Sequence, residues 1–209
     1  MSYRLFYAPG TASFAVHWML VELGVEHALE RVDLKAERST AYRALNPAGR
    51  VPTLVVDGAP VSESAALLTL LAERHGAFAP PVGGAERVRW LEAGAYLTST
   101  LAPAMRDIFY ADQDGDPADA DAVRRLAQRR IEAAWERLDG WLADGRTHLV
   151  GDEATTVDFQ AIMLMRWSRN MPRPATDWPH IDAYVRRLRA RPGFVETCRR
   201  EGLTEWLNA

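Results

Sequence analysis

The stretch "NPAGRVPTLVVDG", residues 46–58, contains the most informative structural signals in this chain. Its apolar, β-branched part indicates a strand, and Asp57-Gly58 is a strong hairpin signal before a second short strand. Pro52 stands between Val51 and Thr53 at the mouth of that strand, although proline has no N–H to give to a sheet. Taken alone, the Val51-Pro52 pair favours an ordinary trans turn, so the reason for this proline has to come from the rest of the chain.

The N-terminal third of the chain, in which this stretch lies, is predicted to alternate strands with helices. Apolar periodicity and turn residues predict the following elements: strands over 3–8 and 27–34, helices over 13–23, roughly 38–45 and 63–76, and a hairpin over 53–61. Ser13 is the expected N-cap of the first helix, and Gly24 is its stop. The order β-α-β-α-β-β-α predicts a small α/β domain.

The remainder of the chain is predicted to be helical. The stretch "AFAPPVGGAE", residues 77–86, breaks the pattern with paired prolines and glycines and indicates a linker. Helical spacing follows over 86–110, 118–144, 155–170 and 178–190. We therefore expect an α/β plus all-α protein, with domains at 1–77 and 87–209 joined by a linker at 78–86.

Composition narrows the class of protein. The chain has 209 residues, a formal net charge of −3 and one cysteine, Cys198. This charge gives no electrostatic footprint for nucleic acid or an anionic membrane, and the apolar runs are too short to span a bilayer. One cysteine and no leader-like start favour a cytoplasmic protein without disulfides. The acidic loop 112–121 lacks the residue order of a calcium-binding loop, so no metal is expected.

Several segments in this order resemble the glutathione S-transferase family, and especially its bacterial beta-class members. They are "LFYAPGTASFAVHWML" (5–20), "NPAGRVPTLVVDG" (46–58), "VSESAALLTLLAE" (61–73), "GDEATTVDF" (151–159) and "RPGF" (191–194). The resemblance covers nearly the whole chain. It implies a thioredoxin-like N-terminal domain that binds glutathione and a helical-bundle C-terminal domain.

The resemblance gives a reason for Pro52. It implies a cis Val51-Pro52 bond, which leaves the main-chain N–H and C=O of Val51 to pair with the cysteinyl part of glutathione, as an added strand would. Glu63 and Ser64 then lie at a helix start, where free N–H groups favour an anion. They are expected to hold the γ-glutamyl end. The alternative is a plain capping pair with Ser62 as N-cap.

Two basic residues complete the implied glutathione site. Lys35 follows the second strand and is placed by the resemblance to meet the glycyl carboxylate. Arg50 contributes its backbone or side chain beside Val51. Both could equally be solvated surface charges.

The group that activates the thiol is less clear from the resemblance. Conjugation needs a thiolate, which a hydrogen-bond donor at a helix start can stabilise. We rank Ser13 first, the Thr11 hydroxyl or N–H second, and Tyr7 third. Beta-class members often have a cysteine where this chain has Ala12, and Cys198 comes too late in the chain to replace it.

Other candidates concern the surroundings of the thiol. His17 shares a helix face with Ser13 and is either a second group of the site or a packing residue. Trp18, Tyr110 and Trp167 are expected to wall a pocket for the electrophile, although tryptophans in such helices are often core residues. The histidine of beta-class helical domains has no counterpart in 98–107.

The function expected from the resemblance is conjugation of glutathione to a hydrophobic, electrophilic small molecule by a homodimer. Two alternatives stay open: a protein of this fold that binds glutathione or a protein partner without turnover, and a glutathione-dependent isomerase or dehalogenase. Thr155 and Asp158 form a predicted capping box, which is a folding element of the helical domain.

Overall fold

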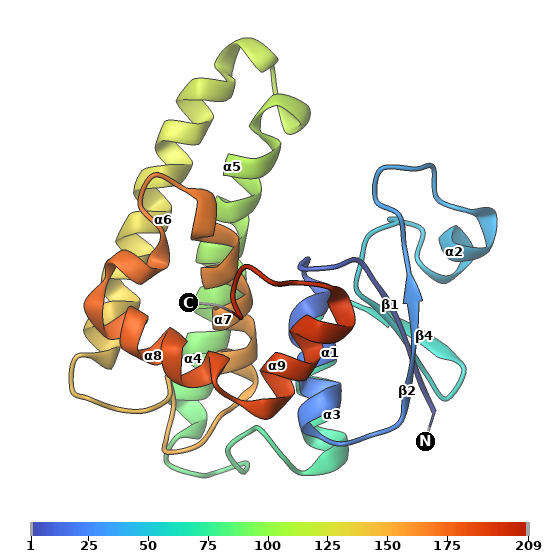
Figure 1. Cartoon of the computed structure of the whole chain (residues 1–209), viewed down its shortest axis with the longest axis horizontal. Coiled ribbons are helices and arrows are strands. Elements are labelled where there is room, and N and C mark those ends of the chain that lie inside the picture. Colours follow the sequence, from blue (N-terminus) through green and yellow to red (C-terminus); the bar gives the residue numbers. More distant parts are fainter. Residues whose placement is uncertain (1, 208–209) are drawn as a thin grey trace. The chain divides into compact units, whose positions relative to one another are not determined.

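The computed structural model describes residues 2–207, which divide into two compact units (Figure 1). The first contains the described residues up to Ala79 together with those from Arg189 onward, and the second is Pro80–Leu188. The first boundary lies close to the expected linker. The C-terminal residues were expected in the helical domain, but they join the first unit because α9 (Pro192–Glu201) packs on α1 (Ser13–Glu22).

A mixed four-stranded sheet forms the centre of the first unit. The strands are β1 (Tyr3–Tyr7), β2 (His27–Arg31), β3 (Thr53–Val56) and β4 (Ala59–Ser62), in the order β2-β1-β3-β4. β1 runs parallel to β2 and antiparallel to β3, and β3 pairs antiparallel with β4. The expected element order is confirmed. Asp57 and Gly58 both have positive φ, 51° and 91°, as a type I′ hairpin turn requires.

Helices cover both faces of this sheet. α1 and α3 (Ser64–His75) lie on one face, with α9 packed against α1, and α2 (Thr40–Leu45) lies on the other face (Figure 1). Side chains alternate accordingly: Leu5 and Leu54 are fully buried on the α1 side. Phe6 and Val55 point the other way and pack with Tyr42 of α2.

Two expected N-caps are wrong by one residue. Ser13 is the first residue of α1, whose N-cap is Ala12, because the Ser13 hydroxyl bonds back to Ala8 instead of to the helix. The N-cap of α3 is Glu63, with φ 72° and ψ 108°, and Ser62 ends β4.

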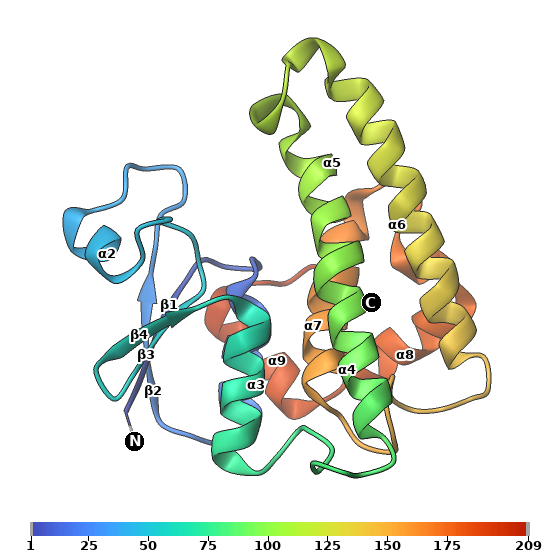
Figure 2. The ribbon, with the colours of Figure 1, turned by 180° about the vertical axis from the view of Figure 1, so that it is seen from behind.

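The second unit is helical. Its α-helices are α4 (Arg87–Tyr96), α5 (Ala102–Asp114), α6 (Ala120–Leu142), α7 (Thr156–Trp167) and α8 (Pro179–Arg189). A π-helical turn over Leu97–Leu101 joins α4 to α5, and α5 and α6 lie side by side as a long pair (Figure 2). Tyr110 has non-helical angles and bends α5. In residues 2–207 we find no helix long and apolar enough to cross a membrane.

The core of this unit is built around α7. Every residue from Thr156 to Arg166 is buried. The predicted capping box is confirmed: Asp158 Oδ2 accepts hydrogen bonds from the Thr155 N–H at 2.7 Å and the Thr155 hydroxyl at 3.1 Å. The other oxygen, Oδ1, accepts from the Leu149 N–H at 3.0 Å and the Tyr184 hydroxyl at 2.7 Å. Asp158 therefore joins α7, α8 and the loop before α7.

Candidate functional site

The candidate site lies at one end of the sheet in the first unit. The starts of α1 and α3 and the loops around α2 come together at this end in both views (Figures 1 and 2). The segment before β3 carries Val51 and Pro52, and their peptide bond is cis, as expected. Within residues 2–207, no hydrogen bond uses the main-chain N–H or C=O of Val51. This edge of the chain is thus available to a ligand.

The segment just before Val51 is held from the inside. The Arg50 carbonyl accepts hydrogen bonds from the Tyr42 hydroxyl at 2.6 Å and from Asn46 Nδ2 at 2.9 Å. Both of these groups also bond Thr53 Oγ1, at 3.0 and 2.9 Å. Burial is the main cause that raises the Tyr42 pKa, which keeps its hydroxyl a donor. The sequence analysis missed these two supports, although Asn46 opens the decisive stretch.

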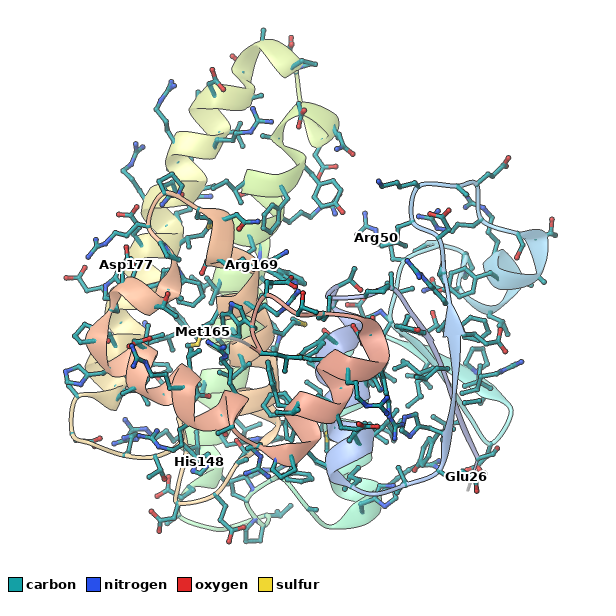
Figure 3. All side chains as sticks on the ribbon, viewed as in Figure 1. Glu26, Arg50, His148, Met165, Arg169 and Asp177 are labelled. Atoms are coloured by element: carbon teal, nitrogen blue, oxygen red, sulfur yellow. The ribbon has the colours of Figure 1, made fainter. Side chains whose placement is uncertain are left out.

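Basic side chains stand on either side of this segment. The Arg50 side chain is exposed, and Figure 3 labels it at the same end of the unit. Lys35 is also exposed, in the loop between β2 and α2, and its N–H donates to Asp33 Oδ1 at 2.9 Å. In the described part of the chain, the Lys35 ammonium has no hydrogen-bond or ion-pair partner, and neither has the Arg50 guanidinium. Both charges are therefore free to meet an anion.

The start of α3 offers main-chain donors. Glu63 is exposed, with a positive φ that is rare for a residue other than glycine, and Ser64 is half-buried. Strained backbone of this kind is concentrated at functional sites. The first N–H groups of a helix lack partners within the helix and attract anions. A carboxylate could bind these N–H groups and the Ser64 hydroxyl. An ammonium beside it could pair with the Glu63 side chain.

The loop between β1 and α1 carries the candidate thiol-activating groups. Ser13 is fully buried; its Oγ accepts from the Ala8 N–H at 3.2 Å and lies 3.1 Å from the Ala8 carbonyl. Thr11 is half-buried, and its hydroxyl donates to the same carbonyl at 2.8 Å and lies 3.0 Å from Ser13 Oγ. The structure thus brings Thr11 and Ser13 together. Tyr7 is half-buried in β1, with its ring 5.9 Å from the ring of His17.

A buried carboxylate ties this loop to the C-terminal helix. Glu201 of α9 accepts from the Gly10 N–H at 2.8 Å, and its other oxygen lies 2.8 Å from His17 Nδ1. A carboxylate only accepts, so Nδ1 carries the proton of this hydrogen bond. His17 is fully buried and Nε2 is among the buried atoms without a hydrogen-bond partner in the described residues. His17 is therefore a buried packing residue that reaches the loop through Glu201.

The candidate electrophile residues are divided between the two units. Trp18 of α1 is only 1% exposed, packs against Phe194 and donates its indole N–H to Glu22 at 2.9 Å. In the second unit, Tyr110 is 40% exposed and lies beneath the Arg106 guanidinium, 4.6 Å from the ring centre. Trp167 packs edge-on against Phe109. Trp18 thus serves the core of its unit, whereas Tyr110 presents an aromatic face to solvent.

Comparison with known families decides the assignment. The model described as the glutathione S-transferase N-terminal domain matches residues 12–74, and the model of the C-terminal domain matches residues 97–192. The chain belongs to the glutathione S-transferase family. Within residues 2–207, no cluster of three histidine, cysteine or acidic residues could hold a metal ion.

Relatives of this glutathione S-transferase agree over nearly full length. Glutathione S-transferase GST-4.5 of Xanthomonas campestris is 29% identical, over 96% of this chain and 99% of that protein. A beta-class glutathione S-transferase of Sphingomonas chungbukensis has 28% identity and a TM-score of 0.83, covering 96% of this chain and all of that one. A sphingomonad glutathione S-transferase solved with glutathione has 29% identity, a TM-score of 0.83 and the same coverage. These likenesses extend through both units.

Proposed function

We propose that this protein conjugates glutathione to a hydrophobic, electrophilic small molecule. The observation that carries the proposal is the unpaired main chain of Val51, which lies at the same end of the sheet as the starts of α1 and α3, because the start of β3 pairs with the ends of β1 and β4. A tripeptide thiol fits such an edge because peptide N–H and C=O groups pair with it as a strand would. The sphingomonad relative was solved in complex with glutathione, which supports the same ligand here.

The two ends of glutathione are assigned by charge. Its γ-glutamyl carboxylate binds the N–H groups at the start of α3 and the Ser64 hydroxyl, and Glu63 faces its ammonium. Its glycyl carboxylate binds between Lys35 and Arg50, whose cationic groups are exposed and unpaired in the part of the chain described. With Val51 holding the cysteinyl part, the thiol points toward the start of α1.

The thiolate is stabilised at the start of α1. On binding, the half-buried Thr11 hydroxyl turns from the Ala8 carbonyl, to which it donates in the free protein at 2.8 Å, to the sulfur, which it meets together with the first N–H groups of the helix. Ser13 helps to position Thr11, because its buried Oγ accepts from the Ala8 N–H and lies 3.0 Å from the Thr11 hydroxyl. This assigns the donor role to Thr11, ahead of Ser13 and of Tyr7. Binding then lowers the pKa of the thiol from its free value of about 8.5.

Tyr110 and Trp167 of the helical unit are the aromatic residues that we propose for contact with the electrophile. Trp18 is only 1% exposed, so its role is to support the core of the first unit and not to line the pocket. As in the family that the chain resembles, we propose a two-fold homodimer in the cytoplasm.

Two measurements test the proposed function. The protein should be retained on immobilised glutathione and should then release halide from an aromatic halide in the presence of free glutathione. Retention without turnover would favour a glutathione-binding protein instead, a role consistent with Ala12 in place of the beta-class cysteine. Failure of both would refute the glutathione site.

Two variants identify the activating group. Ultraviolet absorbance of the bound thiolate against pH gives the thiol pKa in the complex. Thr11→Ala should raise this pKa toward the free value while binding persists. Ser13→Ala should have a smaller effect on the pKa and a larger one on stability, since Ser13 is buried against Ala8. The reverse order would return the donor role to Ser13.

A further inference from the structure

The loop between β2 and α2 is organised by a single guanidinium. Arg38 Nε donates to the Gly49 carbonyl at 3.0 Å, and Nη2 donates to the Leu34 carbonyl at 2.9 Å. Nη1 donates to the Asp33 carbonyl at 2.7 Å and also to the Ala36 carbonyl. Arginine has five N–H donors in a rigid fork. Four of them are thus spent on main-chain carbonyls.

These four carbonyls belong to two separate segments of the chain. Leu34 and Ala36 flank Lys35, whose own N–H is held by the Asp33 carboxylate. Gly49 directly precedes Arg50. Arg38 therefore cross-links the segment that carries Lys35 to the segment that carries Arg50.

Gly49 is fitted to this contact. Its φ is +64°, a conformation that glycine adopts without strain. A Cβ added at this position would lie 3.1 Å from Arg38 Cγ. A side chain at residue 49 would therefore push the arginine away by a few tenths of an ångström.

We propose that Arg38 is a positioning residue that sets the spacing between Lys35 and Arg50, and so selects for the glycyl carboxylate of glutathione. This inference rests on the proposed function. Arg38 acts through the two segments, because its fork is occupied by their carbonyls. A lysine at position 38 keeps the charge but lacks the planar fork, so it cannot hold both segments.

The probe is glutathione compared with its glycyl monoethyl ester, which lacks only the charge that Lys35 and Arg50 are proposed to meet. Isothermal titration gives the dissociation constant of each ligand and hence their ratio. The unmodified protein should prefer glutathione. Arg38→Ala should reduce that preference about 5- to 20-fold, near the lower end of what one charge-assisted hydrogen bond contributes, and should change ester affinity less than about twofold.

A conservative variant separates positioning from simple charge. Arg38→Lys should lose the preference as Arg38→Ala does; retention of the preference would mean that only the charge matters and would overturn the inference. Arg4→Ala is the matched control, because Arg4 is an exposed arginine that pairs with Glu30 at 3.1 Å, outside the proposed site. It should leave both dissociation constants unchanged.

A second perturbation keeps the test decisive if Arg38→Ala does not fold. Gly49→Ala pushes directly on Arg38 and should reduce the same preference. An unchanged preference in Arg38→Ala, or in Gly49→Ala where it stands in for that variant, would overturn the positioning role and leave the proposed function intact. If the unmodified protein binds neither glutathione nor the ester, the proposed function itself fails, and the inference falls with it.

Discussion

Replacement of Asp158 by alanine should destabilise the protein severely and leave the candidate glutathione site untouched. Asp158 is fully buried, and its two oxygens accept from the Thr155 and Leu149 N–H groups and from the Tyr184 hydroxyl. Alanine removes every one of these acceptors at once. The donors stay buried because they come from three different segments packed around α7.

The magnitude follows from the number of stranded donors. A buried donor without an acceptor costs about 1–3 kcal/mol. The fourth donor, the Thr155 hydroxyl, can rotate to another partner. The other three give roughly 3–9 kcal/mol before relaxation, and water entry or small shifts recover part of this. We expect Asp158→Ala to lower the free energy of unfolding by about 3–5 kcal/mol, which is near the upper end for single substitutions.

Denaturant unfolding followed by tryptophan fluorescence measures this loss, and titration of the folded protein measures glutathione affinity. Tyr184→Phe removes one donor and keeps the carboxylate, so it should cost only about 1 kcal/mol. Asp152→Ala is the matched control, since Asp152 is exposed in the loop before α7. A loss below about 1 kcal/mol for Asp158→Ala would refute the reasoning, as would a weaker affinity per folded molecule with unchanged stability.

Four further predictions concern the first unit and α6. Glu201→Gln leaves one accepting oxygen for two donors, the Gly10 N–H and His17 Nδ1. It should therefore lower the free energy of unfolding in denaturant titration by about 1–3 kcal/mol, and an unchanged value would contradict this network. Burial is the main cause that lowers the pKa of His27, with smaller contributions from the nearby charges. The unfolded chain then takes up this proton first, so stability should fall as pH falls below about 6.5, and His27→Asn should flatten that slope; an equal slope would refute the assignment. Gly140 has open space for a Cβ inside α6, so Gly140→Ala should raise the melting temperature through about 0.5–1 kcal/mol of helix stabilisation. Gly193→Ala should lower the melting temperature, because a Cβ there would lie 2.6 Å from the Glu22 carboxylate, which Arg191 holds in place. A lower melting temperature for Gly140→Ala or a higher one for Gly193→Ala would contradict the respective prediction.

Much of the fold was predictable because local chemistry and tertiary structure agree. The hairpin at Asp57-Gly58, the stops at Gly24 and Gly76, and the Thr155–Asp158 box are signals carried by neighbouring residues. The caps of α1 and α3 were predicted at Ser13 and Ser62, one residue away from the observed Ala12 and Glu63. In α1 the hydroxyl of Ser13 has a partner in Ala8, outside the helix. The N-cap preference of serine does not show whether its hydroxyl has another hydrogen-bond partner outside the helix.

Long-range supports were not predictable from spacing. Glu201 meets Gly10 across most of the chain, and Arg38 meets Gly49 across a helix. Their partners are main-chain groups, which every residue possesses, so the sequence contains no pattern that identifies them. The assignment of α9 to the first unit was missed for a different reason. Its contact with α1 depends on packing of Phe194 against Phe14 and Trp18, and apolar periodicity does not say which two helices pack together.

The return of α9 to the first unit affects how this protein is made. During synthesis the sheet and α1 leave the ribosome long before the helix that covers α1 exists. The N-terminal unit must therefore wait, partly open, for about a hundred residues of another domain to be translated. A fragment that stops at Ala79 would lack this cover permanently and would expose the apolar side of α1 that Phe194 covers in the whole chain.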